Sequence, residues 1–251
     1  MLLRTEDLVS NPTPRVPICL CLDTSGSMDA VEGGNYVQTG RTVFRDGREW
    51  NVVTGGTSRI SELQKGIELF YDSIRDDDIA VYSAEICIVT FNDKAECVLD
   101  FANVERQTDI PQLYADGETY IGEGVNLALN LLEKRKQEYK DKGVDYYQPW
   151  LVLMTDGVPN GSASEMERAV SRTVDLVNQK KLTVFPIAIG TEPDISALAR
   201  FSPKRPPLKL QGLKFREFFA WLSKSVSKTS QSIPGEAVKL DLEGIKGWAE
   251  L

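Results

Sequence analysis

The segment 17–28, PICLCLDTSGSM, is an apolar run that ends in side chains carrying oxygen. One carboxylate and two hydroxyls follow at alternate positions, as Asp23, Ser25 and Ser27. Gly26 allows the backbone to turn sharply between the two serines, so both hydroxyls can face one point. Oxygen ligands at this spacing, at the tip of a buried strand, suit a hard divalent cation such as Mg²⁺.

A second apolar run, WLVLMT at 150–155, also ends in a carboxylate, Asp156, which Gly157 follows. Two buried strands that both place Asp at their carboxyl ends predict one site at the top of a parallel sheet. Two carboxylates balance a divalent charge without saturating it, so the ion keeps waters or an open position for an outside oxygen. The candidate metal ligands are Asp23, Ser25, Ser27, Thr119 and Asp156.

The elements that must position these residues alternate between strands and helices along the chain. Alternation of this kind predicts an α/β fold with a doubly wound, mainly parallel sheet and helices on both faces. A hairpin supplies one antiparallel edge strand. The predicted strands are 16–22, 83–91, 95–101, 149–155, 182–189 and a short edge strand at 206–210. The predicted helices are 58–74, 123–142, 164–181, 194–200 and 214–227, with a capping box at Ser164 and Glu167 and a helical turn near 110–113.

The domain organisation follows from these elements. Residues 1–15 are predicted to form an N-terminal arm, 16–228 the domain, and 229–251 a tail that docks through Val238, Leu240, Leu242 and Trp248. An insertion at 29–57 directly follows the serine loop. It contains β-prone runs at 38–45 and 48–53 around Asp46-Gly47, a dipeptide typical of type I′ turns, and so predicts a hairpin near residues 35–54.

Composition excludes several classes of function. The chain has 251 residues and a formal net charge of −8, which argues against a general nucleic-acid binder. Lys204 and Arg205, with Lys209, can still form a local basic patch for a phosphate or an acidic partner, although the sequence favours an exposed basic turn over such a patch. The sequence predicts no membrane insertion and no secretory signal, and so a cytoplasmic protein.

The chain contains no histidine. A Ser-His-Asp or Cys-His nucleophile system and a His-ligated metal centre are therefore impossible. Cys19, Cys21, Cys87 and Cys97 lack the Cys-x-x-Cys spacing of a zinc site, so we interpret them as small apolar residues of the core.

Three separated motifs resemble the metal-ion-dependent adhesion site (MIDAS) of von Willebrand factor type A (vWA) domains, over about 15–228. They are Asp23-x-Ser25-x-Ser27, Gly117-Glu118-Thr119 and Thr155-Asp156-Gly157. The resemblance implies a Rossmann-like fold in which Ser25 and Ser27 ligate the metal directly, Asp23 and Asp156 act largely through water, and Thr119 ligates when its loop is near. It also implies a protein partner whose acidic side chain completes the metal shell.

Other segments are similar to bacterial TerY-type proteins of tellurite-resistance and stress-response gene clusters. They are PRVP at 14–17, SPKRPPL at 202–208, FFAWLS at 218–223 and SIPG at 232–235. The chain departs from compact vWA domains at the insertion 29–57, which either covers the metal site or builds its binding surface.

The interpretation favoured by the sequence is a non-enzymatic, metal-dependent protein-interaction module, monomeric, with Mg²⁺ as its ion and Mn²⁺ or Ca²⁺ as alternatives. A Mg²⁺-dependent phosphohydrolase is a second hypothesis, because such enzymes also place Asp at the end of the first parallel strand. They usually carry a second Asp where this chain has Ser25. A structural protein with a vestigial metal site is the third.

Overall fold

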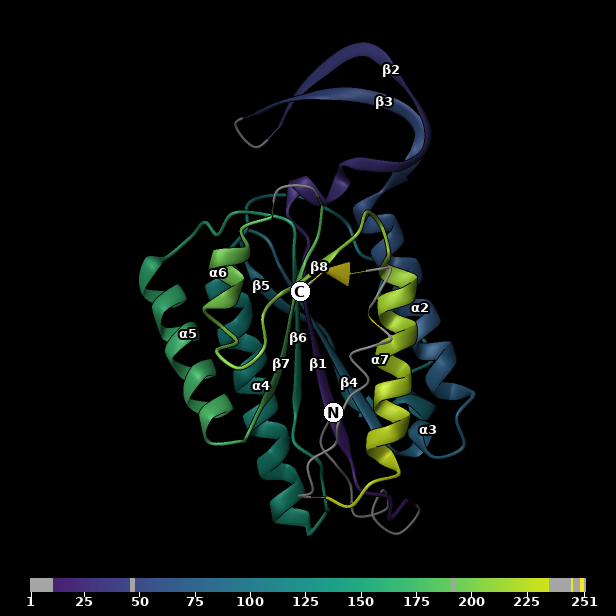
Figure 1. The fold of residues 1–251 in the computed structure, drawn as a ribbon, viewed down its shortest axis with the longest axis vertical. Helices are drawn as coiled ribbons and strands as arrows, with labels where there is room; N and C mark the ends of the chain where they lie inside the picture. Colours follow the sequence, from purple (N-terminus) through teal and green to yellow (C-terminus); the bar gives the residue numbers. More distant parts are fainter. Residues whose placement is uncertain (1–10, 46–47, 191–192, 235–244, 246–248, 251) are drawn as a thin grey trace.

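A computed structural model describes residues 11–45, 48–190, 193–234, 245 and 249–250. A seven-stranded sheet in the order β5-β4-β1-β6-β7-β8-β9 forms the centre (Figure 1). Strands β4, β1, β6, β7 and β8 are parallel, whereas β5 and β9 run antiparallel at the two edges. The strands are β1 Val16–Asp23, β4 Ala84–Phe91, β5 Ala95–Asn103, β6 Trp150–Thr155, β7 Thr183–Ala188, β8 Leu208–Leu210 and β9 Ala249–Glu250.

Helices cover both faces of this sheet (Figure 1). α2, α3 and α7 lie on one face, and α4, α5 and α6 lie on the other. Their bounds are α2 Arg59–Arg75, α3 Ala80–Ser83, α4 Ile121–Lys142, α5 Ala163–Asn178, α6 Ile195–Ala199 and α7 Phe215–Ser230. Short 3₁₀ turns are η1 Gly26–Asp29 and η2 Val104–Arg106. The predicted fold class, a mainly parallel sheet between two helical layers, is confirmed.

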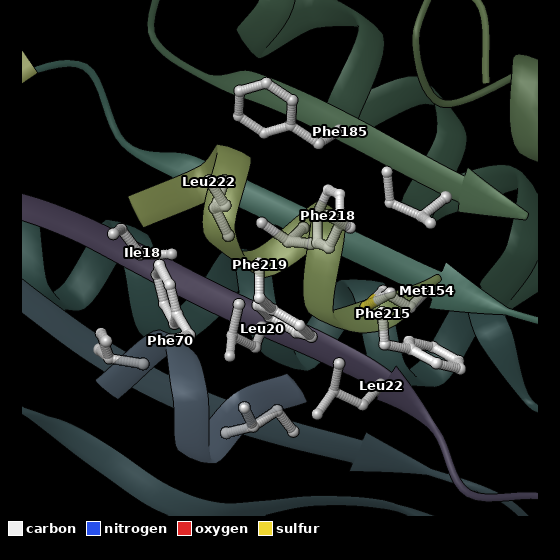
Figure 2. Close-up of a cluster of buried hydrophobic side chains, with 14 of the residues drawn as sticks. Ile18, Leu20, Leu22, Phe70, Met154, Phe185, Phe215, Phe218, Phe219 and Leu222 are labelled. Carbon is white, nitrogen blue, oxygen red and sulfur yellow. The ribbon is translucent and has the colours of Figure 1, made fainter. Parts of the chain in front are cut away.

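The central strand β1 packs against both helical layers. Its alternate residues Ile18, Leu20 and Leu22 face the side of α2 and α7 (Figure 2). Cys19 and Cys21 belong to the core on the α4 side, where both are fully buried. A strand that is buried on both faces needs a continuous apolar run, which is what 16–22 provides.

Two strands form the insertion, β2 Val31–Arg45 and β3 Arg48–Ser58, which pair antiparallel. They extend beyond the predicted runs at 38–45 and 48–53, and the turn 46–47 lies outside the described residues. The register shifts between Val31 and Gly33, Gly33 and Tyr36, and Gln38 and Thr42. Glycine in a strand often marks such irregularities, and the broken alternation is why the outer parts of the pair were missed.

Four local predictions differ from the structure. The α5 cap is Ser162, whose hydroxyl accepts from the Glu165 amide, rather than Ser164 with Glu167. The helical turn of the long loop is η2, and residues near 110–113 are not helical because the Leu113 amide donates to the Gln64 side chain. Cys97 is exposed, unlike the other three cysteines.

The fourth difference concerns the sheet edge. β8 is not an edge strand, since β9 pairs with it through Lys209 and Leu210. Ile245 and Ala249 of the tail are buried. Val238, Leu240, Leu242 and Trp248, predicted to dock, lie outside the described residues.

Candidate metal centre

The serine loop begins where β1 ends, at the carboxyl edge of the sheet. The Ser25 amide donates to Asp23 Oδ1 at 2.8 Å, which turns the chain back over the strand end. The Gly26 amide donates to the Gly117 carbonyl at 2.9 Å and ties this loop to the loop that carries Thr119. Two predicted motifs that are far apart along the chain are therefore joined by a backbone hydrogen bond, between Gly26 and Gly117.

A chain of oxygen atoms connects the two strand ends. Ser25 Oγ lies 3.0 Å from Ser27 Oγ, and the Ser27 hydroxyl donates to Asp156 Oδ1 at 2.6 Å. Asp156 follows β6, which pairs in parallel with β1. The structure thus brings both serines and Asp156 into direct contact, as parallel neighbouring strands require.

Asp23 lies deeper than the serines and is fully buried. Its Oδ2 accepts from the Thr155 hydroxyl at 2.5 Å, while Oδ1 accepts from the Ser25 amide. Burial, with repulsion from the Asp156 carboxylate, raises the pKa of Asp23 from 3.8 to about 7, although the bonds from Ser25 and Thr155 lower it. A cation near Asp23 and Asp156 would lower the free-energy cost of holding both carboxylates charged.

Thr119 is buried and lies against the corner that follows Asp156. A Cβ added at Gly157 would lie 3.0 Å from Thr119 Oγ1, and the Thr119 carbonyl accepts from the Asn160 amide at 2.9 Å. Gly117 fixes the approach of this loop: its φ is +73°, and an added Cβ would lie 2.7 Å from the Asp93 carboxylate. Thr119 therefore lies at the border of the site, beside Gly157. Its contacts are with Gly157 and Asn160 rather than with Ser25, Ser27 or Asp23.

Arg59 and Glu32 also belong to the site, although the sequence did not predict either of them. Arg59 Nη1 donates to Asp156 Oδ2 at 2.5 Å, and its Nε donates to Glu32 Oε1 at 3.0 Å. Both side chains are mostly buried, and Asp156 fully so. Gly190 makes room for the guanidinium, since a Cβ there would lie 2.6 Å from Nη2.

Position along the chain explains why this pair was missed. Glu32 is at the base of the hairpin, and Arg59 is the first residue of α2, directly after β3. A lone Arg after a helix cap usually means no more than a solvated helix end, and only the closure of the hairpin brings it to Asp156. No local spacing carries that signal.

The donor set fits a small divalent cation. Neighbouring ligands of an octahedral ion with bonds of 2.0–2.1 Å lie about 2.9 Å apart, and Ser25 Oγ and Ser27 Oγ are 3.0 Å apart. All predicted donors are oxygen, which hard cations prefer. Arg59 on Asp156 shows that the site already attracts positive charge. Which residues ligate an ion stays a prediction.

We expect the free energy of unfolding of the metal-free protein to depend on pH through the raised pKa of Asp23. A carboxyl whose pKa is higher in the folded than in the unfolded state binds more protons when folded, so its contribution to stability falls as the pH rises from about 4 to 7. The slope is roughly 1.4 kcal/mol per pH unit. Urea unfolding in EDTA should therefore show that Asp23→Asn removes this loss; parallel profiles for the two proteins would contradict the assignment.

Comparison with known proteins defines the class. The arrangement described above is a cluster of oxygen-bearing side chains in the loops that follow β1 and β6, at the carboxyl edge of a doubly wound sheet. The family model for the von Willebrand factor type A domain matches residues 18–158. The chain belongs to this family. No curated protein sequence matches it.

Solved structures share the fold at low sequence identity. A von Willebrand factor type A protein from Catenulispora acidiphila superimposes with a TM-score of 0.59 at 14% identity, over 86% of this chain and 43% of that one. The PilB minor pilin from Streptococcus sanguinis gives 0.56 at 14%, over 86% and 62%. Proximal thread matrix protein 1 from the mussel byssus, with a zinc-occupied MIDAS motif, gives 0.53 at 16%, over 86% and 49%. The chain thus spans about half of these proteins.

Proposed function

We propose that the protein is a divalent-metal-dependent protein-docking module with Mg²⁺ as its ion. The observation that carries the proposal is the continuous oxygen cluster of Ser25, Ser27 and Asp156 beside the buried Asp23. The zinc-occupied motif of the mussel protein supports a metal at this place in the fold. A bound ion would supply an electrophilic centre to which an acidic side chain of a protein partner could bind.

The hairpin supplies a surface at the same end of the molecule. β2 and β3 rise beyond the end of the sheet where β1 ends and curve above it, without packing on either face of the sheet (Figure 1). The pair exposes large apolar side chains, which in a small domain often mark a contact surface. They are Tyr36, Val37, Val43 and Phe44, from 47% to 78% exposed. We therefore propose that the hairpin builds the docking surface beside the metal instead of covering it.

A catalytic role for Asp23 fits the contacts poorly. Asp23 is fully buried, and its two carboxylate oxygens accept hydrogen bonds from the Ser25 amide and the Thr155 hydroxyl, which supports a positioning role over nucleophilic attack on a substrate. The position of a phosphatase's second Asp is taken by Ser25. We propose on these grounds that the module is not an enzyme.

The biological setting is proposed from sequence segments alone. The stretches 14–17, 202–208, 218–223 and 232–235 support a place among TerY-type proteins of bacterial tellurite-resistance or stress-response systems, and a cytoplasmic location with a monomeric state accompanies that proposal. In the described part of the chain, no helix has the length and apolarity to cross a membrane.

Arg59 should compete with the metal. Its guanidinium pairs with Asp156 at 2.5 Å, so a divalent ion next to that carboxylate meets a fixed positive charge. We expect Arg59→Ala to raise the affinity for Mg²⁺ by about tenfold, measured by isothermal titration calorimetry. Lys65→Ala, which removes a charge from an exposed ion pair on the same helix, is the matched control and should leave the affinity unchanged. A weaker affinity in Arg59→Ala would show that the guanidinium supports the site.

A pull-down from native extract tests docking itself. The immobilised protein should retain a partner in Mg²⁺ and release it in EDTA, and Asp23→Ala should retain none in either buffer. In a separate variant, Phe44→Ser removes an exposed apolar side chain of the hairpin. It should weaken binding of the partner without changing the affinity for Mg²⁺. Equal capture with and without EDTA would refute metal-dependent docking.

A further inference from the structure

A cavity of about 650 Å³ lies at the opposite end of the sheet from the metal centre. Its wall includes Trp150 and Thr183, the first residues of β6 and β7, whereas Asp156 follows the other end of β6. The last turns of α4 and the end of α5 complete the wall. Its volume is within the range of small-molecule sites.

The charge of this wall is opposite to that of the protein. The chain as a whole carries 37 acidic and 29 basic residues, yet the described lining contains six basic side chains and no carboxylate. The six are Lys136, Lys140, Lys180, Lys181, Lys204 and Arg205. A positive cavity in an acidic protein concentrates anions locally, because low-dielectric walls focus the field.

Most of these cations are not neutralised by a carboxylate. Among the residues that the structure describes, only Lys136 of the six forms an ion pair, with Glu133. Lys204 Nζ donates to the Val177 carbonyl, and Arg205 lies over the Phe185 ring at 5.1 Å. Partial burial lowers the pKa of Arg205. A half-buried guanidinium that rests on an aromatic ring rather than a carboxylate is ready to receive an anion.

The backbone at Lys180 adds an independent observation. Its φ is +57°, and it is the one non-glycine residue with positive φ in the described ranges. The Lys181 amide donates to the Leu176 carbonyl at 2.8 Å, so Lys180 is the left-handed residue that ends α5. Glycine is the usual residue at such a position, and a side chain there costs of order 1 kcal/mol. The turn places Lys180 and Lys181 together on the cavity wall after α5. The negative ends of the α4 and α5 dipoles favour lysine nearby, but they do not account for Arg205, which belongs to neither helix.

We propose that this cavity binds a small molecule that carries a di- or triphosphate group. Several lysines and one arginine around a space of this size match a short chain of phosphates, for which lysine acts as a point charge and arginine as a planar donor. A free nucleotide and inorganic polyphosphate share that chemistry. The proposal does not depend on the metal centre, which faces the other end of the sheet.

Calorimetric titration in EDTA, which keeps the metal centre out of the measurement, tests the proposal with ATP, tripolyphosphate and adenosine. We expect ATP and tripolyphosphate to bind and adenosine not to bind. Equal affinities would assign the site to the phosphate chain alone, and tighter binding of ATP would assign it to a nucleotide.

Lys140→Gln with Lys180→Gln should weaken binding at least tenfold, since both side chains are exposed and line the cavity. The matched control, Lys65→Gln with Lys94→Gln, removes the same charge from exposed ion pairs elsewhere and should change binding less than twofold. Absence of binding by either phosphate compound, or equal weakening in both double variants, would overturn the proposal.

Discussion

Replacing Glu85 by alanine should lower the free energy of unfolding by roughly 3–5 kcal/mol, the cost of leaving buried charges without their partner. Glu85 is 1% exposed at the start of β4. Arg15 Nε lies 3.2 Å from Oε1, and Arg135 Nε donates to Oε2 at 2.7 Å. The Tyr139 hydroxyl donates to the same Oε2 at 2.5 Å. One carboxylate thus balances two buried guanidinium groups.

In the Glu85→Ala variant, only one of the two arginines still pairs with a carboxylate. Arg135 keeps Glu138 at 2.7 Å, whereas in the described part of the chain the other hydrogen bonds of the Arg15 side chain go to carbonyl oxygens, including that of Asn11 at 2.8 Å. The result is checked by urea unfolding followed by circular dichroism. Glu96→Ala, on the neighbouring strand and in an exposed pair with Lys94, is the control and should cost less than about 1 kcal/mol. Equal losses in the two variants would contradict the role of Glu85.

The double variant Ser25→Ala with Ser27→Ala should lose Mg²⁺ binding, with an affinity at least 100-fold lower in calorimetry. Only Asp23, Asp156 and Thr119 of the predicted ligands remain, and the hydroxyl link from Ser25 through Ser27 to Asp156 is gone. The fold should persist, because β1 is held by its apolar residues and by β4 and β6.

Ser164→Ala is a suitable control for the double variant, since Ser164 is exposed and bonds to Ser162. It should bind Mg²⁺ as the unaltered protein does. Thermal unfolding with and without Mg²⁺ gives a second measurement: the ion should raise the Tm of the control and leave that of the double variant unchanged. An unchanged Mg²⁺ affinity in the double variant would remove both serines from the site.

The sheet and the core of the site could be predicted because their signals are local. Residues 16–22 and 150–155 are continuous apolar runs, and each is followed directly by its Asp. Parallel neighbouring strands end at the same edge, so two such runs are enough to bring Asp23 and Asp156 together. The contact from Ser27 to Asp156 follows from that rule without knowledge of the rest of the chain.

The parts that were missed depend on contacts between distant segments. Arg59 meets Asp156 only because the hairpin returns the chain to the serine loop, and β9 pairs with β8 although Ala249 and Leu210 are far apart in the sequence. The basic cavity also depends on contacts between segments that are far apart in the sequence. Lys204 and Arg205 were visible as a basic turn, but their proximity to Lys136 and Lys180 arises from the packing of α4, α5, α7, β6 and β7.

A crystal structure of the protein grown with Mn²⁺ in place of Mg²⁺, with anomalous diffraction data, tests the central claim most directly. The account predicts one anomalous peak within bonding distance of the Ser25 and Ser27 hydroxyls and near Asp23 and Asp156. Arg59 should then have moved away from Asp156. A site without a peak at millimolar Mn²⁺, with Arg59 still bound to Asp156, would contradict the account.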